Sequence, residues 1–162
     1  MTLGMRSPRN RVERKSILWW TTANLAKAVG VLGALALLHA VSEPSRPWLE
    51  PVLGVLGVVY ALRVTVAPTC RYLIHRWEVS DEAVYSLRGW VVREWRVTPV
   101  SRIQTIDTIR GPLQQLFGLA TLRVTTASRQ GQVIISGLDA DVATRLAAEL
   151  TAVTQATPGD AT

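Results

Sequence analysis

The chain has 162 residues, a net charge of +6 at pH 7, one cysteine and two histidines. This composition excludes an intrachain disulfide framework and a cysteine-based zinc site, and it argues against a histidine metal centre. Residues 1–76 hold ten basic and three acidic residues, whereas residues 77–162 hold eight basic and nine acidic residues. A nucleic-acid-binding domain concentrates positive charge in its folded part, so we expect no nucleic-acid partner.

Two long apolar stretches follow the basic start of the chain, one over 17–41 and one over 48–67. Each is close to the roughly 20 residues that span a bilayer, and the short SEPSRP link between them favours a tight turn. They predict a transmembrane helical hairpin over 17–67. A cleavable signal peptide, with its basic region at 1–16 and its apolar region at 28–41, stays open as an alternative. So do two buried helices of a soluble protein, although neither stretch carries polar residues at a period of 3.6.

The flanking charges predict the orientation of this hairpin. Five basic residues precede the first stretch, Arg71 and Arg76 follow the second, and the link carries only Arg46. By the positive-inside rule, we expect a multi-pass protein of the cell membrane with both termini cytoplasmic and 1–16 as a basic cytoplasmic segment. Three tryptophans at the ends of the stretches are expected to act as interfacial anchors: Trp19, Trp20 and Trp48.

Two basic residues interrupt the apolar stretches at one depth. Taking about 1.5 Å per residue, Lys27 lies about 21 Å from the outer end of the first stretch and Arg63 about 22 Å from that of the second. Snorkelling of long side chains explains the pair; binding of an anionic lipid phosphate at the inner leaflet is the alternative. Together with Arg71 and Arg76 at the inner membrane face, these residues form the candidate lipid-binding set.

Short alternating segments replace the apolar stretches in the second half of the chain. Six strands are predicted, at 74–80, 83–87, 90–98, 101–109, 120–126 and 133–135. A single helical turn follows Gly111-Pro112, and its Leu113, Leu116 and Phe117 are expected to close the sheet. Asp139 is expected to cap a helix whose apolar face carries Val142, Leu146, Leu150 and Val153. Residues 155–162 are expected to form a disordered tail.

Several motifs in this half resemble a known family: VSDEAVYSLRGW, PVSRIQTID, GPLQQLFGLATLRVTTAS and ISGLDA. The chain from about residue 70 to 152 is similar to the bacterial pleckstrin-homology (PH) domain of YdbS-like membrane proteins, and the preceding pair of helices fits that family. The resemblance implies an α+β, mainly β fold. It consists of a two-helix transmembrane hairpin and then a bent antiparallel PH-like sandwich of about seven strands over 70–154, capped by the C-terminal helix. The seventh strand is expected within 103–110, where three isoleucines break the period of two and indicate a bulge.

The candidate sites for chemistry are few. In eukaryotic PH domains that bind phosphoinositides, basic residues cluster in the first hairpin loop, but here that loop is the acidic Ser80-Asp81-Glu82. Four arginines remain as a candidate basic surface, with an ordinary solvated surface as the alternative: Arg88, Arg93, Arg96 and Arg102. We find no catalytic motif and no metal or cofactor site, and we expect Cys70 to be a passive thiol at the membrane boundary.

These observations predict a non-enzymatic, membrane-anchored scaffold or oligomerisation module at the inner face of the cell membrane. Its expected partners are membrane lipids and either another protein or a second copy of the chain, with no small-molecule substrate. Small residues at four-residue spacing in the apolar stretches would close the hairpin or build such a dimer. The alternative function is a sensor that binds anionic lipid headgroups.

Overall fold

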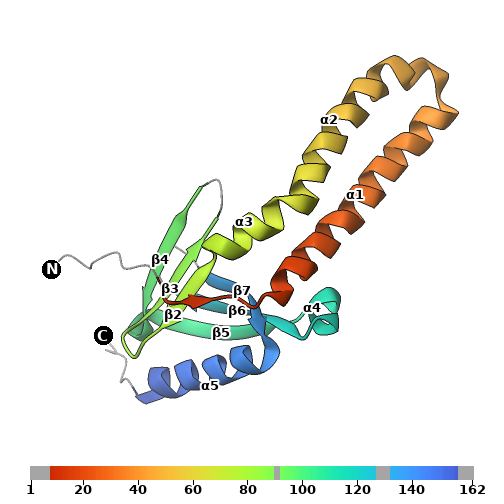
Figure 1. Cartoon of the computed structure of the whole chain (residues 1–162). Helices are drawn as coiled ribbons and strands as arrows, with labels where there is room; N and C mark the ends of the chain where they lie inside the picture. The colour runs from red at the N-terminus through yellow and green to blue at the C-terminus, as the bar shows by residue number, and fades with distance from the viewer. Residues whose placement is uncertain (1–7, 90–91, 127–131, 157–162) are drawn as a thin grey trace. The chain divides into compact units, whose positions relative to one another are not determined.

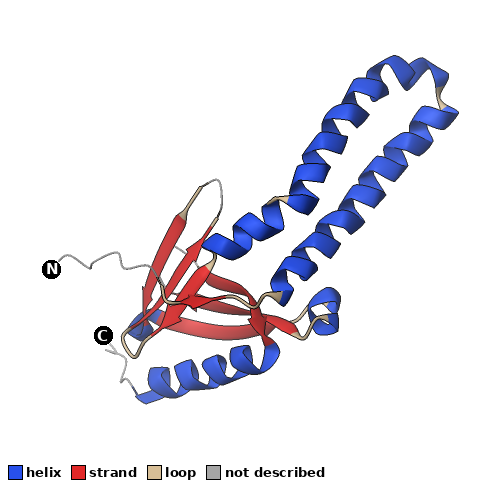
Figure 2. Cartoon of the chain, viewed as in Figure 1, coloured by secondary structure: helices blue, strands red, loops and turns tan. Residues whose placement is uncertain are grey.

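The computed structural model describes residues 8–89, 92–126 and 132–156 and has an α+β fold (Figures 1 and 2). Its helices are α1 (Lys15–Val41), α2 (Arg46–Thr65), α3 (Ala67–Ile74), α4 (Pro112–Leu116) and α5 (Ala140–Ala156). Its strands are β1 (Asn10–Arg11), β2 (Arg76–Val79), β3 (Ala83–Arg88), β4 (Glu94–Pro99), β5 (Ile103–Ile109), β6 (Leu119–Thr126) and β7 (Val133–Asp139). Ile17–Cys70 forms one compact unit, the hairpin unit; the chain before and after it forms the other, the sheet unit.

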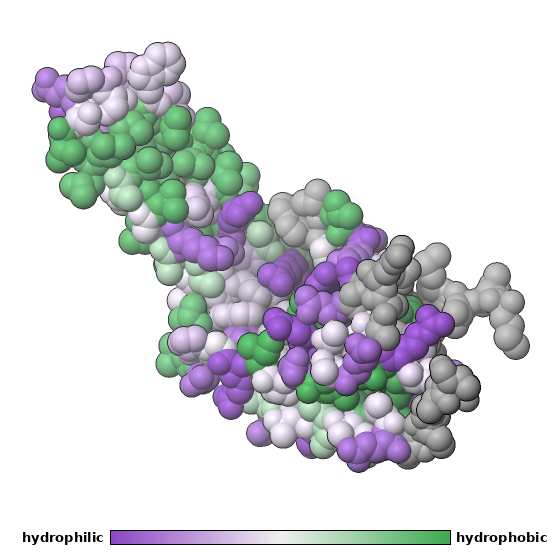
Figure 3. Space-filling model, turned by 180° about the vertical axis from the view of Figure 1, so that it is seen from behind, coloured by the Kyte–Doolittle hydropathy of each residue, from purple (hydrophilic) through white to green (hydrophobic). Residues whose placement is uncertain are grey.

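The hairpin unit consists of two antiparallel helices whose apolar side chains face outward. Both Lys15–Val41 and Glu43–Thr65 are long and apolar enough to cross a membrane, and almost none of either is buried. On the face shown in Figure 3, apolar residues form a band on these helices next to a polar tip. They therefore differ from the buried core helices of a soluble protein. Of the tryptophans predicted to be interfacial anchors, Trp48 is 79% exposed, whereas Trp20 is buried and offers a membrane interface little surface.

The sheet unit contains two antiparallel sheets. Sheet A has the order β1-β2-β3-β4 and sheet B the order β5-β6-β7. Strands β2 to β7 correspond to the six predicted strands. β2 begins at Arg76 because α3 continues to Ile74, and β7 extends to Asp139. The start of the predicted strand 90–98 lies in part outside the described residues. Of the predicted disordered tail 155–162, residues 155 and 156 are helical because α5 continues to Ala156, so the prediction is wrong for these two; the rest lies outside the described residues.

The seventh strand is β1, which precedes the hairpin and pairs with the start of β2. The indole Nε1 of Trp77 donates a hydrogen bond to the carbonyl oxygen of Arg11 at 3.3 Å, which fastens the two strands together. The prediction of an additional strand within 103–110 was therefore wrong, because β5 occupies that segment as one strand. The predicted bulge is confirmed by a register shift between Ile103 and Thr105.

The core of the sheet unit lies between the sheets and beneath α5. Its fully buried side chains include Val84, Leu119, Leu122, Val124, Ile135, Leu138 and Leu150. The predicted cap of α5 is confirmed, since a carboxylate oxygen of Asp139 accepts a hydrogen bond from the Asp141 N–H at 3.0 Å. The four residues of the predicted apolar face of α5 are all buried or half-buried.

The predicted helical turn is present as α4, and of its predicted apolar face Leu113 and Phe117 are half-buried. Leu116 is 75% exposed, so its predicted role in closing the sheet is wrong, and Gln114 is buried instead. The Gln114 side chain accepts a hydrogen bond from the Gly111 N–H at 2.9 Å and donates one to the Thr121 hydroxyl at 2.7 Å. A buried amide with both functions satisfied holds α4 to β6.

Candidate functional site

One end of the inner face of sheet A is polar, and it forms the candidate site. The register pairs Ser86 with Arg96 and Arg88 with Glu94 across β3 and β4. Because successive residues of a strand point to opposite faces, these four side chains share one face. That face is directed towards sheet B, since Arg96 Nη1 donates a hydrogen bond to the carbonyl oxygen of Gln132, just before β7, at 2.9 Å.

A single carboxylate links two arginines at this end. Arg88 Nε donates to one oxygen of Glu94 at 2.7 Å, and Arg96 Nε donates to the other at 2.6 Å. The three side chains are about one third exposed, at 31% for Arg88, 29% for Arg96 and 37% for Glu94. The hydrogen bonds from Arg88 and then Arg96 lower the pKa of Glu94, so this carboxylate stays ionised at neutral pH.

Two residues just before β2, Arg71 and His75, have pKa values that desolvation and the charge of Arg88 lower. Arg71 lies in α3 with an exposed side chain; desolvation by the surrounding protein, followed by the charge of Arg88, lowers its pKa. His75 is buried between α3 and β2, and burial, followed by the charges of Arg71 and Arg88, lowers its pKa to about 4. His75 is therefore neutral at pH 7 and contributes no charge. We call Arg88, Glu94 and Arg96 the arginine cluster; the exposed Arg71 is not counted in it.

Ser86 is the buried polar residue of the same face. Its side chain is 2% exposed, and its hydroxyl has no hydrogen-bond partner among the residues that the structure describes. In the register it lies between Trp77 of β2 and Arg96 of β4. A buried hydroxyl without a partner costs about 1–3 kcal/mol, which makes it a place where a ligand atom can gain a hydrogen bond.

The turn after β3 depends on glycine. Gly89 has a positive φ of 91°, and a Cβ at this position would lie 1.9 Å from the carbonyl oxygen of Val92. Arg93, the residue directly before β4, is exposed and outside the arginine cluster. Of the four arginines expected to form a surface, Arg88 and Arg96 thus meet at Glu94 and are partly buried, while the other two are exposed.

The candidate lipid-binding residues divide between the two units. In the hairpin unit, the Asn24 amide donates a hydrogen bond to the carbonyl oxygen of Arg63 at 3.1 Å. Lys27 follows Asn24 by about 4.5 Å of helical rise, so Lys27 and Arg63 lie at similar levels, and both are exposed. In the sheet unit, Arg71 is an exposed residue of α3. Arg76 alternates with Trp77 along β2 and so lies on the opposite face of sheet A from the arginine cluster.

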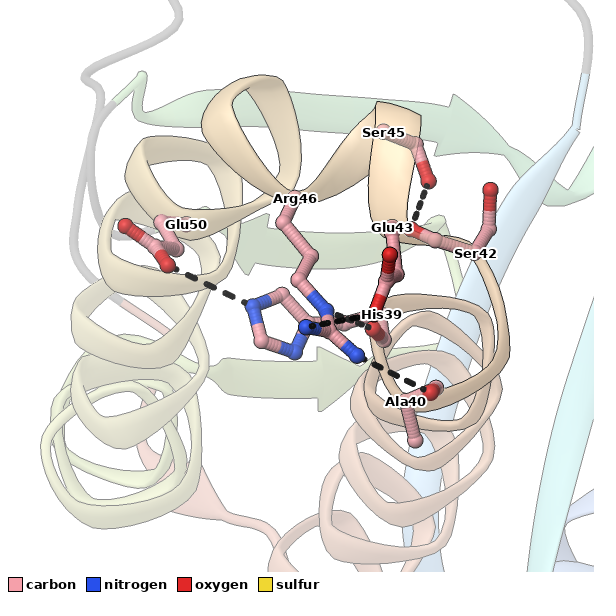
Figure 4. Close-up of polar contacts among 7 residues, drawn as sticks. All are labelled: His39, Ala40, Ser42, Glu43, Ser45, Arg46 and Glu50. Carbon is pink, nitrogen blue, oxygen red and sulfur yellow. Dashed lines mark hydrogen bonds and ion pairs between the residues drawn. The ribbon is translucent and has the colours of Figure 1, made fainter.

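A second group of polar contacts closes the tip of the hairpin (Figure 4). His39 Nε2 lies 3.5 Å from a carboxylate oxygen of Glu50, which joins α1 to α2. Arg46 donates hydrogen bonds to the carbonyl oxygens of His39 and Ala40 and lies 3.7 Å from Glu43. These contacts satisfy the C-terminal carbonyls of α1, so the tip is a structural cap.

No three His, Cys, Asp or Glu side chains of the described ranges 8–89, 92–126 and 132–156 are grouped so as to hold a metal ion. Sequence reasoning named the arginines but missed Ser86 and His75. The signal that identifies Ser86 is the register: once β3 and β4 pair around the Gly89 turn, Ser86 falls on one face with Arg88, Glu94 and Arg96.

Comparisons with known proteins cover nearly all of this architecture. A family model for the bacterial PH domain matches residues 27–154. The UPF0699 transmembrane protein YdbS of Bacillus subtilis (strain 168) is 28% identical over 158 residues, which cover 94% of this chain and 97% of that relative. No solved structure gives a significant match.

Proposed function

Since the chain belongs to the bacterial PH domain family, we propose that it is a membrane-anchored, non-catalytic interaction module. In this proposal the hairpin crosses the cell membrane twice, and the sheet unit recruits a protein partner or a second copy at the inner face. The observation that carries the proposal is the contrast between the units. The hairpin exposes its apolar side chains along its length, whereas the sheet unit has a core of its own. Anchoring raises the effective concentration of the sheet unit at the membrane, so weak contacts suffice.

The charge distribution supports cytoplasmic termini. Arg46 at the hairpin tip lies beside Glu43 and binds two main-chain carbonyls, so the tip carries little uncompensated positive charge. The basic residues at the other end of the hairpin remain, and they favour the cytoplasmic side. A single cysteine placed at Ser42 in a Cys70→Ser background tests this orientation. We expect Ser42→Cys to react with an impermeant maleimide in intact cells; reaction only after lysis contradicts the orientation.

Strand β5 is the surface we propose for the partner or second copy. It is an edge of sheet B, and four of its seven residues are exposed: Gln104, Thr105, Asp107 and Thr108. An edge strand offers main-chain donors and acceptors to an added strand. A photoreactive residue in place of Thr105, in the full chain in native membranes, tests this surface, with the same residue in place of Thr144 on α5 as the control. We expect one discrete crosslinked product from position 105 and none from position 144. Equal products, or none from either, contradict the proposal.

A second candidate function is sensing of anionic lipid headgroups by Lys27, Arg63, Arg71 and Arg76. The observation in its favour is the hydrogen bond from Asn24 that aligns Lys27 and Arg63 on neighbouring helices, since two like charges at one level favour a shared anion. The double variant Lys27→Ala, Arg63→Ala is expected to lose co-purifying anionic lipid. An unchanged lipid content of the purified variant removes this candidate.

A further inference from the structure

The two ends of sheet A differ in their connections to the hairpin. The register pairs Arg76, at the start of β2, with Arg11 of β1 and with Leu87 of β3, and it pairs Arg88 with Glu94. The turn between β3 and β4 therefore lies at the end of sheet A where the chain leaves β1 for the hairpin and re-enters at β2. We call this end, which is marked by Arg11, Arg76 and the β3–β4 turn, the junction end.

Two large apolar side chains are exposed at the junction end. Val92, in the β3–β4 turn, is 77% exposed, and Leu73, three residues before β2, is 51% exposed. Single exposed apolar residues are ordinary on a protein surface. Their meaning here therefore depends on the charges around them.

The exposed charges at the junction end are mostly basic. In the described residues 10–15 and in the β3–β4 turn, a single exposed acidic residue, Glu13, accompanies four exposed basic residues: Arg11, Arg14, Lys15 and Arg93. Exposed apolar side chains surrounded by basic ones are typical of protein surfaces that bind to anionic lipid, because the apolar groups enter the headgroup region while the basic groups bind phosphate.

The opposite end of sheet A has an acidic turn. The exposed Asp81 and Glu82 form the tip of the turn between β2 and β3. The Val100 N–H donates a hydrogen bond to the main-chain carbonyl oxygen of Glu82 at 2.9 Å, so the exposed Arg102 lies at this end too. An anionic surface attracts the junction end and repels the acidic turn, which favours one orientation of sheet A on such a surface.

We propose that the junction end of sheet A binds the surface of an anionic bilayer, with Val92 in the headgroup region and Arg93 on lipid phosphates. The connectivity favours this occupant. Residues 12–14 alone separate β1 from α1, and α3 alone, with one residue on either side, separates α2 from β2. A bilayer that the hairpin spans is thus present at a high effective concentration. The contact rests on the proposed insertion of the hairpin and goes beyond partner binding through β5.

Single cysteines in the full chain test the contact. In a Cys70→Ser background, Val92→Cys and Glu82→Cys are each labelled with a fluorophore that is sensitive to polarity. The labelled chains are placed in nanodiscs of phosphatidylcholine, with or without phosphatidylglycerol. Lipids with a spin label just below the headgroup are expected to quench the label at position 92, and more strongly when phosphatidylglycerol is present. The same label at position 82 is expected to stay unquenched.

Two charge variants of the labelled Val92→Cys chain test the role of the arginine. Arg93→Gln is expected to lower the ratio of docked to undocked sheet unit about fivefold in phosphatidylglycerol nanodiscs. This fold-change corresponds to the roughly 1 kcal/mol that one arginine gains near an anionic membrane. The control, Arg102→Gln, removes an equal charge from the opposite end of sheet A and is expected to leave the ratio unchanged. Added salt is expected to weaken quenching at position 92.

Four results overturn the proposal. One is no lipid quenching at position 92 with phosphatidylglycerol, and another is equal quenching at positions 92 and 82, which indicates tethering alone. The third is an apolar emission at position 92 without lipid quenching, which identifies a second copy of the chain as the occupant. The last is an equal effect of Arg93→Gln and Arg102→Gln. Recovery of the chain in nanodiscs reports insertion of the hairpin separately, so failure of the contact is distinguishable from failure of the anchor.

Discussion

The buried histidine makes the stability of the sheet unit dependent on pH. His75 is 1% exposed, and burial with the nearby charges of Arg71 and Arg88 lowers its pKa from 6.5 to about 4. As the pH falls below 6.5, the unfolded chain binds a proton at this residue before the folded chain does. The contribution of His75 to stability is therefore complete above pH 6.5 and is lost as the pH falls towards 4.

The magnitude follows from the difference between the two pKa values. Each pH unit between them corresponds to about 1.4 kcal/mol, so lowering the pH from 7.5 to 5 costs about 2 kcal/mol at this residue. For a domain of about 100 residues, that loss lowers the melting temperature by roughly 8–16 °C. The pKa of Glu94 is also lowered, but this carboxylate is present in wild type and variant alike and so does not affect their comparison.

The assay compares variants across this pH range. Thermal unfolding of the full chain in nanodiscs is followed by circular dichroism for the wild type, His75→Gln and His39→Gln. We expect His75→Gln to have a shallower loss of stability between pH 7.5 and pH 5, because it has no proton to gain there. His39→Gln removes the other histidine and is expected to retain the wild-type slope. Parallel curves for the wild type and His75→Gln would refute the reasoning.

Three further variants probe the turn, the core and the hairpin. Gly89→Ala is expected to cost about 1–3 kcal/mol, and more than Gly118→Ala. Both glycines have positive φ, but only at position 89 does the added Cβ meet a main-chain oxygen, at 1.9 Å. Leu122→Ala is expected to cost about 2–5 kcal/mol at its fully buried site, with Leu116→Ala as the exposed, near-neutral control. Thermal unfolding measures all four. Asn24→Ala removes the hydrogen bond between α1 and α2 and is expected to weaken the association of the two helices by about 0.6 kcal/mol. The distance between spin labels on α1 and α2 measures this change and is expected to increase.

Local signals sufficed for most of the fold. The long apolar stretches predicted α1 and α2 because a span needs length and apolar composition, and both can be counted along the chain. Alternation of apolar and polar residues predicted β6, since a half-buried strand repeats every two residues. The carboxylate of Asp139 predicted the start of α5 for an equally local reason, because it binds an N–H two residues away.

The features that were missed depend on pairing between distant segments. The strand β1 has two residues, too few for any periodic pattern, and its position depends on a contact between Arg11 and Trp77, 66 residues apart. The exposure of Leu116 was unexpected because the polar Gln114 takes the inward position to satisfy Gly111. Predicting the arginine cluster likewise requires the register of β3 and β4, and the positions of the basic residues along the chain do not reveal which of them pair across the two strands.

The position of β1 changes how the anchor relates to the domain. Residues 12–14 alone separate β1 from α1, and His75 alone separates α3 from β2, so the hairpin is an insertion between two neighbouring strands of sheet A. Truncation before residue 70 removes β1, leaves β2 as an edge strand and deprives the Trp77 indole of its acceptor, the Arg11 carbonyl. A water-soluble sheet unit must therefore retain residues 8–16 and join them to Arg71 through a flexible linker in place of the hairpin. That form preserves the pairing of β1 with β2, directly after His75.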